Sequence, residues 1–149
     1  MKMRTVPPLV PALVKPTLDT PFHVEYTWWD RRKLNLSAEL RAHLCDTHRA
    51  VFTDEVDTDE RIDWVDQKSG EVTQVHGLQH ILRVHCSNEP GYIDSGLSLV
   101  DAVLRVFLAN GNIPLTPKEL ATAIGRRPDK ILQTLSGRRV YKGIRPYAG

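Results

Sequence analysis

The sequence predicts an α+β fold in which a small mixed domain precedes a basic domain of three helices. Residues 1–21 are rich in proline, residues 22–95 alternate between strand-like and helix-like patterns, and residues 96–149 hold successive helical segments with clear start and stop signals. We expect strand, helix, β-hairpin and helix in the first domain. The second domain is expected to close with one short strand.

Composition and length indicate an ordinary globular protein. The chain has 149 residues, of which 41% are hydrophobic and 26% charged, so it can bury one sizeable core or two small ones. No apolar run approaches the roughly 18 to 20 residues that span a membrane. Prolines at positions 7, 8, 11 and 16 would break a signal-peptide helix, so we expect a cytoplasmic protein. Two cysteines are too few for a disulfide framework and are expected to be thiols or metal ligands.

The first 21 residues are expected to form an extended, polyproline-like arm. Five prolines alternate there with aliphatic residues, which makes the segment more apolar than an ordinary linker. The arm is therefore a candidate contact for a protein partner or for a second copy in a homodimer. The alternatives are a disordered tail and an arm lying on its own domain.

Apolar and polar residues alternate from Phe22 to Trp28, which predicts a strand with one buried face. In such a strand only one of Trp28 and Trp29 can face the core. Ser37 is the expected N-cap of a helix over 38–52. The next stretch, 53–66, holds seven acids and one arginine and is expected to be a solvated acidic edge rather than a calcium loop.

A β-hairpin and a short helix complete the predicted first domain. Residues 61–66 and 71–75 have strand-like composition and are joined by a four-residue loop that contains a glycine. Residues 78–86 then follow a helical pattern, and Asn88, Glu89, Pro90 and Gly91 end it.

The cysteines and four of the six histidines form two clusters that could hold a structural zinc ion. Cys45 and His48 lie three positions apart on the predicted helix, so their side chains share one face. Cys86 and one histidine of the second cluster would complete the site, which would join two elements of a small domain. The histidines of that cluster are His76, His80 and His85.

We take His80 as the fourth ligand, together with Cys45, His48 and Cys86. Residues six apart on a continuous helix face different directions, so this choice requires the helix to end before Cys86. The neighbours His85 and Cys86 also diverge in a regular helix. The alternative is that both cysteines are small buried apolar residues and that the histidines are hydrogen-bonded or exposed.

The last third of the chain begins with a predicted helix over 98–111 and continues with two short helices. Thr116, Pro117 and Glu119 supply a capping hydroxyl, a first-turn proline and a capping-box acid for the second helix. Gly125 ends that helix. Pro128 begins the third helix, which runs to about residue 135.

The spacing of small and apolar residues across the two short helices resembles the helix-turn-helix motif. Ala121 and Gly125 are followed by Ile131, six residues after the glycine, and by Leu135, four residues later. The resemblance implies that the helix over 128–135 enters the DNA major groove and that the helix over 98–111 completes a trihelical core. The alternative is a plain helical hairpin that packs on the protein's own core.

One position departs from this pattern, and the tail suggests a variant of it. Arg126 follows the turn glycine where this family usually has an apolar residue, so the turn is expected to differ. The tail contains Val140, Tyr141 and Ile144 around Gly143, a short strand that could pair with residues 113–115. This resembles the winged variant of the motif, with a minimal wing.

Charge is distributed unevenly along the chain. Residues 126–149 contain seven basic residues and one acid, a net charge of +6, whereas the whole chain has +2, so the remainder has −4. A basic module joined to an acidic one is the electrostatic pattern of a protein that binds phosphate. The resemblance implies that Lys130, Gln133 and Thr134 meet base edges. The resemblance also implies contacts with the DNA phosphate backbone from Arg126, Arg127, Arg138, Arg139, Lys142 and Arg145.

We therefore expect a protein that binds double-stranded DNA, most simply a transcriptional regulator that acts as a dimer. An enzyme is not expected, because Cys45 and His48 lack an evident oxyanion hole and there is no phosphate-binding glycine loop. The alternative function is that of a structural or adaptor subunit. In that case the helix-turn-helix fold, the proline-rich arm and the tryptophans would form protein interfaces.

Overall fold

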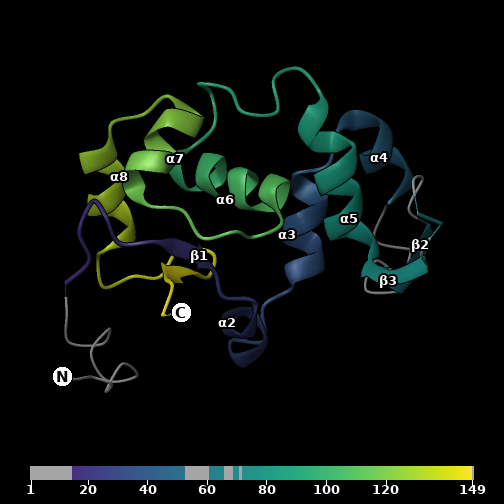
Figure 1. Cartoon of the computed structure of the whole chain (residues 1–149), viewed down its shortest axis with the longest axis horizontal. Coiled ribbons are helices and arrows are strands. Elements are labelled where there is room, and N and C mark those ends of the chain that lie inside the picture. Colours follow the sequence, from purple (N-terminus) through teal and green to yellow (C-terminus); the bar gives the residue numbers. More distant parts are fainter. Residues whose placement is uncertain (1–14, 53–60, 66–68, 71, 149) are drawn as a thin grey trace.

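The structure is a computed structural model that describes residues 15–52, 61–65, 69–70 and 72–148. Most of the predicted arm and of the acidic stretch at 53–66 lies outside the described residues. Figure 1 shows α6 at the centre of the molecule, with α7 and α8 at one end and α4, α5 and the β2–β3 hairpin at the other. The mixture of helices and short strands agrees with the predicted α+β class.

Short helices make up most of the described secondary structure. The helices are α2 (Tyr26–Arg31), α3 (Leu36–Ala42), α4 (Asp46–Val51), α5 (Gly77–Val84), the 3-10 helix η1 (Cys86–Asn88), α6 (Leu99–Asn110), α7 (Pro117–Ile124) and α8 (Pro128–Leu135). The strands are β1 (Phe22–Val24), β2 (Arg61–Val65), β3 (Val72–His76) and β4 (Ile144–Pro146). Strands β2 and β3 form the predicted antiparallel hairpin, with Arg61 opposite His76 and Val65 opposite Val72.

Strand β1 lies between two segments of the C-terminal third. It pairs antiparallel with β4, with Phe22 opposite Pro146, and Phe22 also exchanges backbone hydrogen bonds of 2.8 and 3.0 Å with Leu115. The prediction that the tail strand pairs directly with residues 113–115 is therefore wrong, because β1 is inserted between them. The amide side chain of Asn112 bonds both backbone groups of Val24, at 2.8 and 2.9 Å, and holds β1 in place.

The predicted strand over residues 22–28 is shorter than expected. Beyond β1 the backbone N–H of Glu25 donates to the carbonyl of Gly143, and the chain then turns into helix α2. In a helix of this length both Trp28 and Trp29 can reach the interior, and both are buried, with their rings in edge-to-face contact at 5.4 Å. The indole Nε1 of Trp29 donates to the carbonyl of Lys142.

The single helix predicted over 38–52 is divided into α3 and α4. Asn35 caps α3, accepting a hydrogen bond from the backbone of Ala38, so the predicted cap at Ser37 is wrong. The break is stabilised by Arg49, whose guanidinium donates to the carbonyls of Leu44 and Ala42, at 2.9 and 3.4 Å. These carbonyls lie at the end of α3, where they have no partner within the helix.

The three C-terminal helices begin and end close to where the sequence predicts. Ser98 caps α6, and Thr116 and Glu119 form the predicted capping box of α7. Gly125 ends α7 with a backbone φ of 69°, a left-handed conformation that glycine adopts without steric cost. Pro128 begins α8, which buries Ile131 and Leu135 as expected.

One continuous hydrophobic core joins elements from both sides of residue 96. Phe107 of α6, which is fully buried, lies in the same cluster as residues from β1, α3, α5, α7, α8 and β4. Each such side chain contributes about 1.5–3 kcal/mol of hydrophobic stabilisation. The buried cluster consists of Phe22, Val24, Leu40, Leu44, Leu78, Leu82, Cys86, Val103, Leu104, Phe107, Leu108, Leu120, Ile131, Leu135 and Ile144.

A chain of polar contacts connects the C-terminal tail to α3 and α6. The ammonium of Lys142 lies 2.7 Å from a carboxylate oxygen of Glu39 on α3 and 2.6 Å from one of Asp101 on α6. The same Glu39 oxygen lies 2.7 Å from Nε2 of His43, and Nδ1 of that ring lies 3.0 Å from Nε of Arg105. The network therefore runs through three separate segments of the fold.

The hydrogen-bond directions in this network determine the tautomer of His43. The guanidinium of Arg105 can only donate, so Nδ1 of His43 must accept and Nε2 must carry the hydrogen that is donated to Glu39. Arg105 in turn donates to the carbonyl of Tyr92, and the Tyr92 hydroxyl donates to the carbonyl of Arg105. These bonds satisfy the polar groups of the His43 side chain, which is 4% exposed.

Replacing Glu39 should destabilise the protein in a pH-dependent way. The hydrogen bond from His43, together with those from Lys142, lowers the pKa of Glu39 from 4.5 to about 2. Its stabilising contribution is therefore complete above pH 4.5 and is lost as the pH falls towards 2. We expect Glu39→Gln to lower the free energy of unfolding at pH 7 by about 1.5–3 kcal/mol, and we expect this difference to shrink between pH 4.5 and 2.

Urea denaturation at pH 7 and at pH 3 measures both quantities. Asp19→Asn is the control, because Asp19 forms an exposed ion pair with Lys118 and should contribute less than about 1 kcal/mol. An equal loss for Glu39→Gln at both pH values would contradict the assigned network.

Candidate functional site

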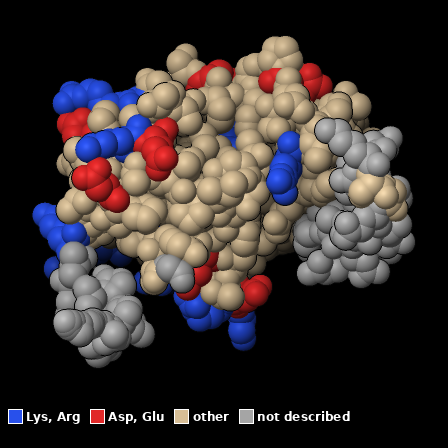
Figure 2. Space-filling view, in the orientation of Figure 1, with Lys and Arg blue, Asp and Glu red and all other residues tan. Residues whose placement is uncertain are grey.

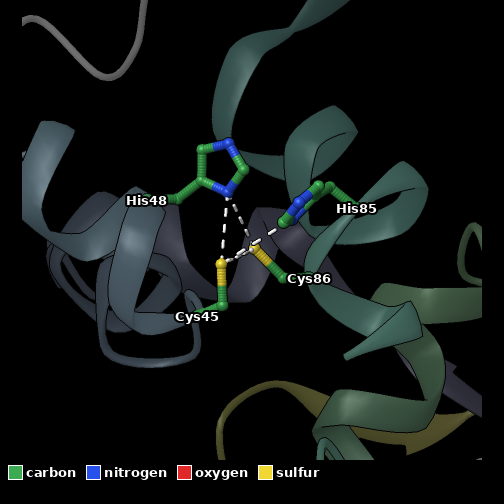
Figure 3. A group of neighbouring side chains, drawn as sticks. All are labelled: Cys45, His48, His85 and Cys86. Carbon is green, nitrogen blue, oxygen red and sulfur yellow. Dashed lines mark hydrogen bonds between the residues drawn. The ribbon is translucent and has the colours of Figure 1, made fainter. Parts of the chain in front are cut away.

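Four side chains that can bind a metal ion converge at one end of the molecule. They are Cys45 and His48 from the start of α4 and His85 and Cys86 from the start of η1 (Figure 3). One donor atom from each residue lies within 4.8 Å of every other. The cluster joins two segments that are separated by about 40 residues along the chain.

Local structure explains why each pair of residues points into the cluster. Cys45 is the N-cap of α4 and His48 lies in its first turn, so the two side chains lie on one side of the helix start, with Sγ and Nδ1 3.2 Å apart. Helix α5 ends at Val84, and His85 then has φ −124° and ψ −63°. This departure from helical geometry allows the neighbouring side chains of His85 and Cys86 to reach the same point.

Three distances between donor atoms fit a tetrahedral ion, and a fourth, the 3.2 Å between Sγ of Cys45 and Nδ1 of His48, would have to lengthen by about 0.4 Å. Bonds of about 2.3 Å to sulfur and about 2.0–2.1 Å to nitrogen imply edges of about 3.8 Å between two sulfurs and about 3.6 Å between sulfur and nitrogen. Sγ of Cys86 lies 3.5 Å from Sγ of Cys45 and 3.6 Å from Nδ1 of His48. Nδ1 of His85 lies 3.7 Å from Sγ of Cys45. The residues can therefore hold a metal ion with little rearrangement.

The surroundings of the cluster also suit a metal ion. Burial raises the pKa of Cys86 to about 11, so its thiolate needs a neighbouring positive charge, which a metal ion supplies. Burial, together with the charge of His85, lowers the pKa of His48 and favours the neutral imidazole that binds metals. Nε2 of His85 lies 3.8 Å from a carboxylate oxygen of Glu89, which can orient the ring from behind.

The sequence prediction identified three of these four residues. Cys45, His48 and Cys86 lie together as expected, whereas the cluster contains His85 in place of His80. His80 lies inside α5, where burial and the nearby charge of Arg83 lower its pKa. The condition that the helix ends before Cys86 is met, and it is this ending that brings His85 into the cluster.

A second group of possible ligands is already occupied by a cation of the chain itself. Glu39, His43 and Asp101 lie close enough together to hold a metal ion. The ammonium of Lys142, however, lies within 2.7 Å of both carboxylates. This group is therefore an internal ion-pair network.

Helix α8 has one buried and one exposed face. Ile131 and Leu135 are buried, whereas Lys130 and Gln133 are exposed and Thr134 is partly exposed. Figure 2 shows Lys and Arg side chains, with some acids among them, on the side of the molecule where Figure 1 places α7 and α8. The exposed side chains of α8 are thus the ones predicted to meet base edges.

The basic residues predicted to contact phosphate differ in their surroundings. Arg138 and Arg139 are exposed, and within the described parts of the chain they form no ion pair. Arg139 lies over the ring of Tyr141, with Cζ 5.1 Å from the ring centroid. Arg127 pairs with Asp129 at 2.8 Å and Arg145 with Glu25 at 3.2 Å.

Two of the predicted contacts are directed into the protein. Lys142 is bound by Glu39 and Asp101, so its charge is balanced within the fold. Arg126 donates to the backbone carbonyl of Leu97, just before α6. The Arg126 side chain thus makes a polar contact at the position where the resemblance led us to expect a different turn. We leave Lys142 and Arg126 out of the proposed interface.

Comparisons with protein-family models, with curated proteins and with solved structures found no match to this chain. Among the helices that the structure describes, none combines the length and the apolar character needed to cross a membrane.

The histidine that completes the cluster can be identified by substitution. Loss of an outer-shell hydrogen-bond partner typically weakens metal binding by ~10–100-fold. We expect His85→Gln to weaken metal binding by more than this, because the substitution removes a ligand atom. His80→Gln is the matched control and should retain the metal. Metal content after dialysis and competition with a coloured chelator measure both variants. Loss of metal from His80→Gln with retention by His85→Gln would contradict the assignment.

Proposed function

We propose that the protein binds double-stranded DNA through α8 and that a structural zinc ion at Cys45, His48, His85 and Cys86 stabilises its other end. The observation that carries the proposal is the exposed polar face of α8, set on a trihelical unit whose caps and spacing resemble the helix-turn-helix motif. A transcriptional regulator in the cytoplasm is the simplest role for such a protein.

The exposed side chains of α8 have the chemistry for reading base edges. Gln133 can bond adenine through both its donor and its acceptor, and Lys130 can donate to guanine. Thr134 can contact either base or a thymine methyl group. Arg127, Arg138 and Arg139 lie next to this helix in the chain and are suited to phosphate, where they would orient α8 without reading sequence.

The donor set supports zinc as the metal. Two cysteine sulfurs and two imidazole nitrogens form a common tetrahedral zinc site, and four protein donors leave no open position for catalysis. The ion would join α4 to the end of α5. Val51 of α4 and Val84 of α5 are exposed, so apolar packing between these two helices is incomplete without the ion. Metal binding would in this way add to folding stability.

Salt dependence tests the DNA proposal most directly. We expect mixed-sequence duplex DNA to bind with a logarithmic salt slope that corresponds to roughly 3 to 6 phosphate contacts, at about 0.9 per contact. Arg138→Gln/Arg139→Gln should weaken binding to all sequences alike and lower the slope by about 1 to 2. Fluorescence anisotropy across a salt series measures both.

Two further variants complete this experiment. Lys130→Ala/Gln133→Ala should weaken a selected preferred site more than a mixed-sequence duplex, by about 1–3 kcal/mol for each lost base contact. Arg41→Gln/Arg83→Gln makes the same change in charge as the arginine variant, on α3 and α5, and should leave binding nearly unchanged. Absence of binding by the unsubstituted protein at low salt would overturn the DNA proposal and favour an adaptor role.

A further inference from the structure

A groove rich in arginine lies between α2 and the segment that follows α8. Its volume is about 800 Å³, and four guanidinium groups line it: Arg31 and Arg32 from α2 and its C-terminal end, and Arg138 and Arg139 from the segment after α8. None of the described residues that line it is acidic. Arg31 and Arg32 are not part of the helix-turn-helix resemblance, and the groove forms only because β1 and α2 pack against the C-terminal tail.

The arginines of the groove are only partly neutralised by the protein. Arg31 lies 3.5 Å from Glu25, in an exposed ion pair that Glu25 shares with Arg145. The structure gives Arg32, Arg138 and Arg139 no acidic partner in its described segments. Like charges that converge on one hollow repel each other, so the groove favours an anionic ligand that reduces this repulsion.

Aromatic rings hold two of these arginines in place. Cζ of Arg32 lies 5.3 Å from the ring centroid of Trp28, and Cζ of Arg139 lies 5.1 Å from that of Tyr141. A guanidinium stacked on a ring keeps its donors directed outward and loses less freedom when it binds a ligand. Two planar donor groups are thus prepared for the bidentate bonds that arginine makes with phosphate.

The two adjacent tryptophans differ in their hydrogen bonding and in their relation to the groove. Nε1 of Trp29 donates to the carbonyl of Lys142. Nε1–H of Trp28 has no acceptor within the described residues and is buried, out of reach of a ligand in the groove. Trp28 therefore serves the groove through its ring, which lies beneath the guanidinium of Arg32.

We infer that this groove binds the sugar-phosphate backbone of the same DNA duplex that α8 contacts, an inference that rests on the proposed function. Arg138 is three residues beyond the last residue of α8, so it lies within about 10 Å of that helix end. The major groove is about 12 Å wide, so a phosphate strand borders any helix that lies in it. The Arg138 side of the groove is therefore within reach of such a strand.

The surroundings of Trp28 favour a duplex over a single strand. Single-stranded nucleic acid is usually held by stacking its bases on exposed aromatic rings. The ring of Trp28 is almost entirely buried, and Arg32 covers it. The groove consequently offers charge and hydrogen-bond donors rather than a stacking surface, which suits a continuous phosphate backbone.

Neutralising the α2 side of the groove tests the inference separately from the helix-turn-helix unit. We expect Arg31→Gln/Arg32→Gln to weaken duplex binding about 10-fold near 0.1 M salt and to lower the logarithmic salt slope by about 1 to 2. The loss should be equal for preferred and mixed sequences, since phosphate contacts carry no sequence information. Arg41→Gln/Arg83→Gln, with the same change in net charge, should bind like the unsubstituted protein.

The outcomes separate the two ideas. If the unsubstituted protein binds and Arg31→Gln/Arg32→Gln matches the control in affinity and slope, the groove inference is wrong while the proposed function stands. If the unsubstituted protein does not bind duplex DNA at low salt, the proposed function fails and the inference fails with it. Tighter binding of a single strand than of the duplex, lost in the same variant, would overturn the choice of occupant.

Discussion

The interaction on which the rest of the structure depends is the pairing of Lys142 with carboxylates from two different helices. Its ammonium can reach both Glu39 and Asp101 because the tail turns sharply there, with positive φ angles of 54° at Lys142 and 78° at Gly143. A side chain at Gly143 would meet Nε1 of Trp29 at 2.9 Å, so only glycine fits. The paired charges offset the cost of partial burial and fix the tail before β4 begins.

The break between α3 and α4 positions residues of both the polar network and the candidate metal cluster. His43 ends α3 and joins Glu39 to Arg105, and Cys45, two residues later, begins α4 with its sulfur in the cluster that could hold a metal ion. This one irregular turn thus directs His43 toward Arg105 on α6 and Cys45 toward the other possible metal ligands. In a continuous helix Cys45 would lie within a regular turn, and its side chain would point in a different direction relative to His43.

Local signals explain what could be predicted from the sequence. The capping box at Thr116 and the first-turn proline at Pro128 act within one turn of helix, and they place α7 and α8 correctly. Whether Trp28 belongs to a strand or a helix depends on where β4 ends its pairing with β1, which is a contact between distant segments. The same holds for the metal cluster, where spacing indicated Cys45 and His48 but the end of α5 selects the partner histidine. The arginine groove forms between α2 and the segment after α8, and no pattern in the sequence links these two distant segments.

The position of β1 also constrains the order in which the protein can fold during its synthesis. The strand is complete at residue 24, yet its partners are Leu115 and β4, which ends at residue 146. Phe22 and Val24, which are almost fully buried in the native fold, therefore lack their full set of native neighbours until residue 146 has left the ribosome. Such distant pairing slows folding, because the loop must close before any contact rewards it. Helices α6 to α8 are close together in the sequence and can form earlier, so β1 is expected to join a helical unit that is already assembled.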